Sequence, residues 1–390
     1  MRIARKGNQQ QGGRWVLAAT VAAVLSSACG ASGGLIRTAD LPTRASSSSL
    51  PASGSLAITS SSGRAGHGLP AGSSTATATL GLAGQKAQNS VSLGPPVTQP
   101  VCADLLPTVT VFHPGGVPGV DWIEELAFDG HGGLWVSPIQ QNFVERFNAA
   151  GAITETVPVP GPGGLIRGPN GLIYVNISGG PSAPGVMRFD PTQATPIAQL
   201  FVSGLPGVNA DAFDSAGNLY VSTEDQPPSV LRIRPDGTRD QAWEEAAAFY
   251  GANGLAVDGR NLFAAISFDQ RSPIEIVPLA DPAAHRVFAQ LSFGLLSRQP
   301  AVYQPDPRAP LVPKGLDDMT LGPDGQLYVV GFASGELLRV DPRTAKACVV
   351  VSGLETPTAV QFAVGFGAFD PVRDLFITEA TGRIVHVHLD

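Results

Sequence analysis

Short apolar stretches alternate with turns rich in Gly, Asp and Asn along the chain from about residue 119 onward. In each repeat a first apolar stretch is followed by a turn and then by a second stretch that carries an aromatic residue. Asp-Gly and Asn-Gly between apolar stretches are strong signals for a β-hairpin. The chain contains six such hairpins, whose aromatic positions are Trp135, Tyr174, Tyr220, Phe263, Tyr328 and Phe376.

Two further strand-like stretches follow each hairpin, for example residues 144–147 and 153–157 after the first. Units of four strands that recur about every 40 to 50 residues are typical of a β-propeller. We therefore predict an all-β fold, a six-bladed β-propeller over residues 103–390. The last unit ends after its third strand, so we expect residues 108–112, from the N-terminal segment, to supply the outer strand of the last blade and close the ring.

The front of the chain differs from the rest and predicts export. Residues 1–29 have the form of a signal peptide: four basic residues, Arg2, Arg5, Lys6 and Arg14, precede or border an apolar run that is too short for a permanent membrane helix. Small residues before Cys29 resemble a bacterial lipoprotein cleavage box. We expect lipidation of Cys29, with ordinary cleavage after Ala28 as the alternative. The protein is thus expected in the cell envelope as a lipoprotein, or in the periplasm or outside the cell.

Residues 30–102 are rich in Ser, Ala, Gly and Pro and contain little large apolar surface, which predicts a disordered linker that tethers the propeller. The whole chain is 43% hydrophobic and 15% charged, enough material for a large core, and its net charge is −7. This charge argues against a nucleic acid or an anionic membrane surface as partner. We expect a monomer that acts on a small molecule and meets a membrane only through a lipid at Cys29.

Cys102 and Cys348 are the two cysteines that remain once Cys29 is assigned to the front of the chain. In an oxidising compartment they form either a disulfide or a pair of buried free thiols. No Cys/His spacing indicates a zinc site, and no serine-hydrolase, nucleotide-binding or dinucleotide-binding motif occurs in the sequence.

Four residues that carry side-chain oxygens recur at the same place in the repeat, about ten positions before the aromatic residue. They are Glu124, Asn209, Asn253 and Asp317. The first strand of a propeller blade lines the central channel, so these side chains are expected to meet there. Two carboxylates and two amide oxygens suit a hard cation, with calcium the first candidate and other divalent ions as alternatives. The alternative interpretation is a polar, hydrated channel.

The segments around these four residues resemble the metal-bearing segments of the regucalcin/gluconolactonase family of six-bladed, calcium-dependent lactonases. They read Glu124-Glu125-Leu126-Ala127-Phe128, Asn209-Ala210-Asp211-Ala212-Phe213-Asp214, Asn253-Gly254-Leu255-Ala256-Val257 and Asp317-Asp318-Met319-Thr320-Leu321. The resemblance implies one divalent ion bound by Glu124, Asn209, Asn253 and Asp317. It also implies catalytic roles for Glu124 and for Asp317, the latter as general base. The implied activity is hydrolysis of a lactone or related ester, with the ion polarising the carbonyl.

Two features of the sequence bear on the substrate. Members that act on sugar lactones carry an Arg two residues before the Asn of the third blade, where this chain has Gly207, so aldonolactones are not expected. The long Pro-rich segment Phe293 to Gly315 leads into Asp317 and is expected either to cover the site or to pack on the rim. Further candidates for specificity in loops on this face are Gln140, Gln141, Glu224, Asp225, Asp269 and Arg271.

Several polar residues near or outside the channel have other interpretations. Strand alternation is expected to turn the residues that flank the ligands away from them, although a register slip would make ligands of these flanking residues: Glu125, Asp211 and Asp318. His386 and His388 share a face of a third strand and are expected to pack there, away from the channel, and His131 is expected at the surface of the opposite rim.

Two other classes of protein remain as alternatives to a lactonase. One is a non-catalytic, NHL-like propeller that serves as a tethered binding module, in which a metal only stiffens the ring. The other is a metal-dependent lyase of the streptogramin-inactivating kind, which would need seven blades and a catalytic His near the channel.

Overall fold

Antiparallel sheets of up to four strands build the part of the chain that the computed structural model describes, residues 98–178, 184–223, 228–295 and 310–390. Blade one contains β2 (Ile123–Phe128), β3 (Gly133–Pro138), β4 (Phe143–Asn148) and β5 (Ile153–Pro158). Blade two contains β6 (Pro162–Arg167), β7 (Ile173–Ile177), β8 (Gly185–Phe189) and β9 (Gln199–Ser203). Blade three contains β10 (Asp211–Phe213), β11 (Leu219–Ser222) and β12 (Val230–Ile233).

The second half of the described chain repeats the same arrangement. Blade four contains β13 (Ala252–Val257), β14 (Asn261–Ile266), β15 (Pro273–Pro278) and β16 (Arg286–Gln290). Blade five contains β19 (Leu316–Leu321), β20 (Leu327–Gly331), β21 (Glu336–Val340) and β22 (Ala347–Ser352). Blade six contains β23 (Pro357–Phe362), β24 (Asp374–Glu379), β25 (Arg383–His388) and β1 (Thr108–Pro114).

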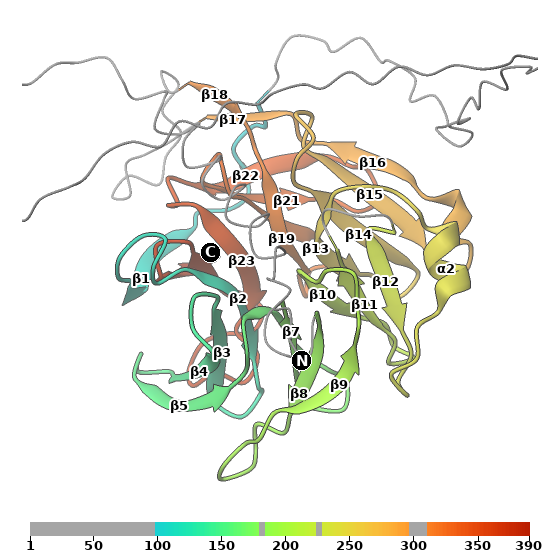
Figure 1. The fold of residues 1–390 in the computed structure, drawn as a ribbon. Coiled ribbons are helices and arrows are strands. Elements are labelled where there is room, and N and C mark those ends of the chain that lie inside the picture. Colours follow the sequence, from blue (N-terminus) through green and yellow to red (C-terminus); the bar gives the residue numbers. More distant parts are fainter. Residues whose placement is uncertain (1–97, 179–183, 224–227, 296–309) are drawn as a thin grey trace, which may run out of the picture. The chain divides into compact units, whose positions relative to one another are not determined.

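The first strands of the blades form a closed ring. Each of β2, β6, β10, β13, β19 and β23 contacts the first strands of the two neighbouring blades, including β23 against β2 (Figure 1). The prediction of a six-bladed propeller is confirmed. A seven-bladed lyase architecture does not fit the ring that the described residues form.

Helical structure is confined in the described residues to α2 (Gln241–Ala246) and one turn of 3₁₀-helix at Pro282–Ala284. The Asp240 side chain caps α2 by accepting a hydrogen bond from the backbone N–H of Trp243, so the helix begins at Gln241. Neither helix has the length and apolar character that a membrane crossing would take. A two-stranded sheet of β17 (Phe293–Leu295) and β18 (Leu311–Pro313) is separate from the sheets of the blades, although Gly294 of β17 lies close to Ser334 and Glu336 of blade five.

The N-terminal part of the described chain closes the ring, as the sequence predicts. β1 pairs antiparallel with β25 as the outer strand of blade six, with Val109 opposite Val387. Before β1, Cys102 lies beside β22, the outer strand of blade five, and its N–H donates to Val349 O (2.9 Å). A disulfide joins Cys102 to Cys348, so of the two interpretations of these cysteines the structure has the bonded pair. The predicted signal peptide and all but the last residues of the predicted linker lie outside the described residues.

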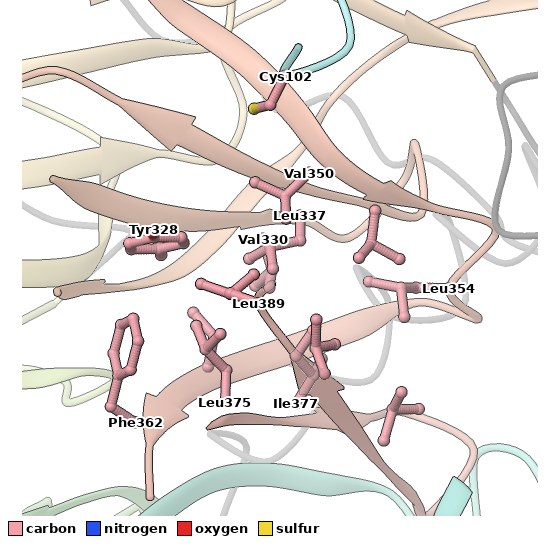
Figure 2. Packing of buried hydrophobic residues seen from close by; sticks show 14 residues of the cluster. Cys102, Tyr328, Val330, Leu337, Val350, Leu354, Phe362, Leu375, Ile377 and Leu389 are labelled. Atoms are coloured by element: carbon pink, nitrogen blue, oxygen red, sulfur yellow. The ribbon is translucent and has the colours of Figure 1, made fainter. Parts of the chain in front are cut away.

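The hydrophobic core lies between neighbouring blades. Figure 2 shows the cluster between blades five and six, in which Tyr328 of β20 faces Phe362 of β23, with ring centroids 5.1 Å apart. Val330 and Leu337 of blade five pack in the same cluster as Leu375 of blade six. Because each blade buries both faces against its neighbours, the aromatic residue of each hairpin belongs to an interblade core. This packing holds the first strands, and the polar residues on them, in fixed positions around the channel.

Candidate functional site

The proposed ligands lie at irregularities of the first strands. In β2 the register passes from Ile123 opposite Pro138 to Leu126 opposite Val136, so one extra residue is accommodated at Glu124 and Glu125. The same shift occurs in β6, in β13 at Asn253 and in β19 at Asp317. Such β-bulges break the alternation of side chains and redirect them, and they are common next to functional sites. The repeat in the sequence therefore corresponds to a repeated bulge in the structure.

Asn209 occupies the equivalent place just before β10. Its backbone N–H donates to Ser222 O (2.8 Å), and the N–H of Ser222 donates to Ala210 O (2.9 Å). The Ser222 hydroxyl then accepts the N–H of Ala210 (2.9 Å), as Ser137 accepts the N–H of Glu125 (3.0 Å) in blade one. A serine on the second strand thus satisfies the extra N–H group of the first strand in both blades.

Asn253 and Asp317 are in direct contact. The Nδ2 of Asn253, in blade four, donates to Oδ1 of Asp317, in blade five, at 2.7 Å, and both side chains are buried. Gly254 makes this approach possible, since a Cβ at that position would lie 2.4 Å from Asp317 O and 2.5 Å from the Cα of Asp318. The Asn-Gly pair of the sequence motif therefore has a physical reason: the Asn contacts the next blade, and the Gly leaves room for it.

A similar relationship positions Asn209. A Cβ on Gly164 of blade two would lie 1.9 Å from Asn209 O, and Asn176 Nδ2 donates to the same oxygen at 2.7 Å.

Glu124 is half-buried, and its Oε2 accepts a hydrogen bond from Trp122 Nε1 at 2.6 Å. Glu124, Asn253 and Asp317 thus lie on first strands and Asn209 lies just before one, and of the four residues Asn253 and Asp317 are in direct contact.

The sequence interpretation of the flanking carboxylates is wrong in one respect. Glu125, Asp211 and Asp318 are buried, and they come from blades one, three and five, that is, from alternate blades around the ring. The charge of Asp318 acts on both Glu125 and Asp211, and that of Asp211 acts on Glu125, so the three lie within electrostatic reach of one another. We infer that they surround the channel axis. We expected alternation to turn Glu125 and Asp318 away, but the bulges of β2 and β19 interrupt that alternation. Asp211 lies two residues after Asn209 on β10, whose pairing with β11 is regular.

Burial governs the protonation of these three carboxylates. Desolvation raises the pKa of Asp318 to about 8, and the charge of Glu124 adds to the rise. Desolvation and then the charge of Asp318 raise the pKa of Glu125 and of Asp211 well above their ordinary values. The nearby Asn176 amide counters part of the rise in the pKa of Asp211, and its Nδ2 also donates an N–H to Asn209 O. In the described part of the chain neither oxygen of Asp211 accepts a hydrogen bond.

A cavity of about 310 Å³ occupies the channel on the other side of this carboxylate group. Asp211 lines it, together with Leu255 and Met319 at the equivalent positions of blades four and five. Arg167, Thr320 and Gln361 add polar groups to the wall, among apolar residues of the first strands. The proposed ligands do not line this cavity and precede these residues on their strands.

An aromatic pair lies beside Glu124. Trp122 stacks on Phe332, with ring centroids 5.6 Å apart and planes at 23°. Trp122 immediately precedes β2, and Phe332 immediately follows β20, so both lie at the end of the blades that carries the proposed ligands. The pair gives this end of the channel an apolar wall. No sequence pattern pointed to it, because the two residues belong to blades one and five and are not part of the repeat.

The remaining specificity candidates differ in what the structure shows. Asp269 and Arg271 pair with each other, Arg271 Nε donating to Asp269 Oδ1 at 2.9 Å. Glu224 and Asp225 lie outside the described residues. In the long Pro-rich segment, β17 and β18 form a hairpin-like pair before Asp317, while the residues between them lie outside the described residues.

His386 and His388 have contacts that the sequence did not suggest. His386 packs on Phe369 and Phe376, with centroid distances of 4.9 and 5.1 Å, so the expected packing is present. Both histidines also lie against one carboxylate, that of Asp374 at the start of β24. Asp374 escaped notice in the sequence because strand pairing, which brings it opposite His388, is not visible in a linear motif.

Solved structures with a similar fold include lactone-hydrolysing enzymes. A gluconolactonase from Xanthomonas campestris has a TM-score of 0.53 at 16% identity, over 76% of this chain and 98% of the other. A putative gluconolactonase has a TM-score of 0.51 at 14% identity, over 75% and 94%. A luciferin-regenerating enzyme has a TM-score of 0.52 at 15% identity, over 73% and 95%.

These similarities agree with the fold that the resemblance implied, a six-bladed propeller, which this chain shares with the gluconolactonases. No protein-family model matches the chain, and no curated protein matches it. At such low identity the shared property is the fold, so the activity of this chain has to be argued from its own residues.

Proposed function

We propose that the chain is an exported hydrolase that opens a lactone or related ester with the help of one divalent cation, calcium first, held by Glu124, Asn209, Asn253 and Asp317. The observation that carries the proposal is the contact of Asn253 with Asp317 inside a repeated set of first-strand bulges. The fold shared with gluconolactonases supports the same reaction type.

The donor set fits a hard cation. Two carboxylates and two amides offer only oxygen ligands, which calcium prefers, and they leave room for water or substrate in its coordination shell. Asn253 directs its Nδ2 to Asp317, so its Oδ1 is the atom it would offer to an ion. The groups around the site fit as well, because Gly254 and Gly164 leave the space in which Asp317 and Asn209 approach from the next blade.

The chain's own residues supply orientation and proton transfer. A bound divalent ion would polarise the ester carbonyl and stabilise the negative charge that develops on its oxygen. Asp317, held by Asn253, orients the attacking water and accepts its proton. Glu124, whose Oε2 accepts a hydrogen bond from the Trp122 indole, would supply the second carboxylate to the ion. A carboxylate near a cation has a lowered pKa, so Asp317 acts through its placement more than through basicity.

The substrate class follows from what borders the site. Gly207 supplies no side chain where sugar-lactone enzymes place an Arg, and the stacked Trp122 and Phe332 offer an apolar surface. We therefore propose a lactone or ester with an apolar ring or acyl group in place of a polyhydroxylated aldonolactone. The tether expected from residues 30–102 would hold the enzyme at the cell envelope.

A panel of lactones and aryl esters tests the proposal. The full chain is assayed after chelation and again after calcium is restored, with aldonolactones and alkyl-substituted lactones compared. We expect turnover of alkyl-substituted lactones that chelation abolishes and calcium restores. Turnover that is indifferent to chelation would contradict the proposal. Calcium that raises the melting temperature without turnover of any substrate would select the binding-module alternative.

A further inference from the structure

Three side chains of metal-binding type meet on blade six. Asp374 is the first residue of β24, and His386 and His388 lie two positions apart on β25, which places them on one face of the sheet. Asp374 Oδ1 lies 2.8 Å from His386 Nε2 and 2.7 Å from His388 Nδ1. One ligand atom from each residue lies within 4.8 Å of the others. The cluster stands on the second and third strands of the blade, apart from β23 at the channel.

The outward atoms of all three residues also have partners. His386 Nδ1 lies 3.1 Å from the hydroxyl of Thr110 on β1, and His388 Nε2 lies 3.3 Å from Asp390 Oδ1. Asp374 Oδ2 accepts the backbone N–H of Asp370 at 2.5 Å. In metal sites a ligating histidine commonly donates its other ring N–H to an oxygen, which fixes the orientation of the ring. Both rings of the cluster have this arrangement.

The inner atoms of the cluster are arranged to share one ligand. Asp374 Oδ1 is within hydrogen-bond distance of both His386 Nε2 and His388 Nδ1. Each of these three atoms can offer a lone pair to a cation. The outer atoms would keep their contacts with Thr110, Asp390 and the backbone of Asp370 when an ion is bound.

We propose that Asp374, His386 and His388 bind one divalent transition-metal ion, zinc being the first candidate. Two imidazole nitrogens and one carboxylate oxygen are a common zinc ligand set, whereas calcium prefers oxygen ligands alone. The side chain of His388 is 33% exposed, so a fourth position faces solvent and takes water. The ion joins β24 to β25 and, through Thr110, to β1, the strand that closes the ring.

Zinc titration of the full chain tests the site. Protein purified without a histidine tag is freed of metal, saturated with calcium and titrated with zinc by calorimetry. We expect one equivalent of zinc in the wild type and at least about tenfold weaker binding in His388→Gln. His285→Gln is the matched control. His285 Nδ1 also contacts one carboxylate oxygen, that of Glu275 at 2.8 Å, but without a second imidazole. Its affinity for zinc should equal that of the wild type.

Cobalt provides a second readout that does not depend on a variant. Bound at this site, Co²⁺ should give visible absorption bands that zinc displaces, and Thr110→Val should weaken binding several-fold without changing the stoichiometry. The proposal is overturned if the wild type binds no zinc, or if His388→Gln binds it as tightly as the wild type. It does not rest on the lactonase proposal, since calcium binding in the channel should be the same in His388→Gln.

Discussion

The amide of Asn253 donates to the carboxylate of Asp317 across the boundary between blades four and five, at 2.7 Å and over 64 positions of sequence. This contact joins two of the four residues that the repeat singles out. It also fixes the rotamer of Asp317, the proposed base. The pair is thus positioned for the proposed cation, and changing Asn253 should affect the protein differently with and without calcium.

Asn253→Asp would place a second carboxylate directly against Asp317. In metal-free protein we expect lower stability, by at most about 4 kcal/mol, because like charges repel at this distance. Calcium should reverse the loss, since an added charge strengthens an oxygen site for a cation. Melting temperatures with calcium and with chelator measure both effects. A calcium-induced rise no larger than that of the wild type would contradict the assignment of Asn253 as a ligand.

Gly254→Ala tests the close approach behind this pair. The new Cβ would lie 2.4 Å from Asp317 O, so we expect a loss of about 1–3 kcal/mol in the free energy of unfolding, together with weaker calcium binding. Gly207→Ala is the control, because its Cβ would meet only Thr223 O at 3.4 Å. Urea unfolding of both variants provides the comparison. Equal free energies of unfolding for Gly254→Ala and Gly207→Ala would contradict this, because they would mean that the strand at Asp317 shifts easily to make room for the new Cβ.

The buried carboxylates predict how stability depends on pH. Asp318 has a pKa of about 8 in the folded chain, above its ordinary value, so between about pH 4 and pH 8 the folded state binds more protons than the unfolded state. Stability conferred by the protonated group is therefore full at low pH and is lost as pH rises through 8. In chelator, the urea midpoint should fall from pH 5 to pH 8, and fall less in Asp318→Asn. Parallel curves for the two proteins would refute this.

The disulfide offers a prediction about ring closure. Cys102 and Cys348 are 246 positions apart, and their bond ties the segment before β1 to blade five. Replacing both with Ser should cost about 2–4 kcal/mol of stability, since it frees a very long loop in the unfolded chain. Thermal unfolding of the double variant measures the loss, and alkylation of unreduced, denatured wild type should modify neither Cys102 nor Cys348. Alkylation of both would show that the bond does not form.

The repeated sequence pattern predicted the ring of blades, because strand periodicity and hairpin turns are local properties and occur six times along the chain. It also predicted the strand that closes the ring, since blade six lacks an outer strand and residues 108–112 had the right pattern. The four oxygen residues were found by their position in the repeat. Their common place at or just before the first strand of a blade follows from the same local pattern.

Other features depended on contacts that a linear pattern does not contain. Glu125 and Asp318 were expected to turn away from the ligands, and a bulge, which depends on pairing with the second strand, reverses that expectation. Asp374 joins His386 and His388 only through the pairing of β24 with β25. Sequence periodicity assumes regular strands, so it fails where the strands are irregular or where side chains from different strands converge.

Calcium binding to two neighbouring variants, Asp317→Asn and Asp318→Asn, tests the central claim most directly. Both changes replace a carboxyl group by an amide of nearly the same shape, but only Asp317 is assigned as a ligand. Calorimetric titration of metal-free protein should give one calcium per wild-type chain, at least about tenfold weaker binding in Asp317→Asn, and nearly wild-type binding in Asp318→Asn. If Asp318→Asn loses the ion while Asp317→Asn keeps it, the flanking carboxylates bind the ion and the proposed site is wrong.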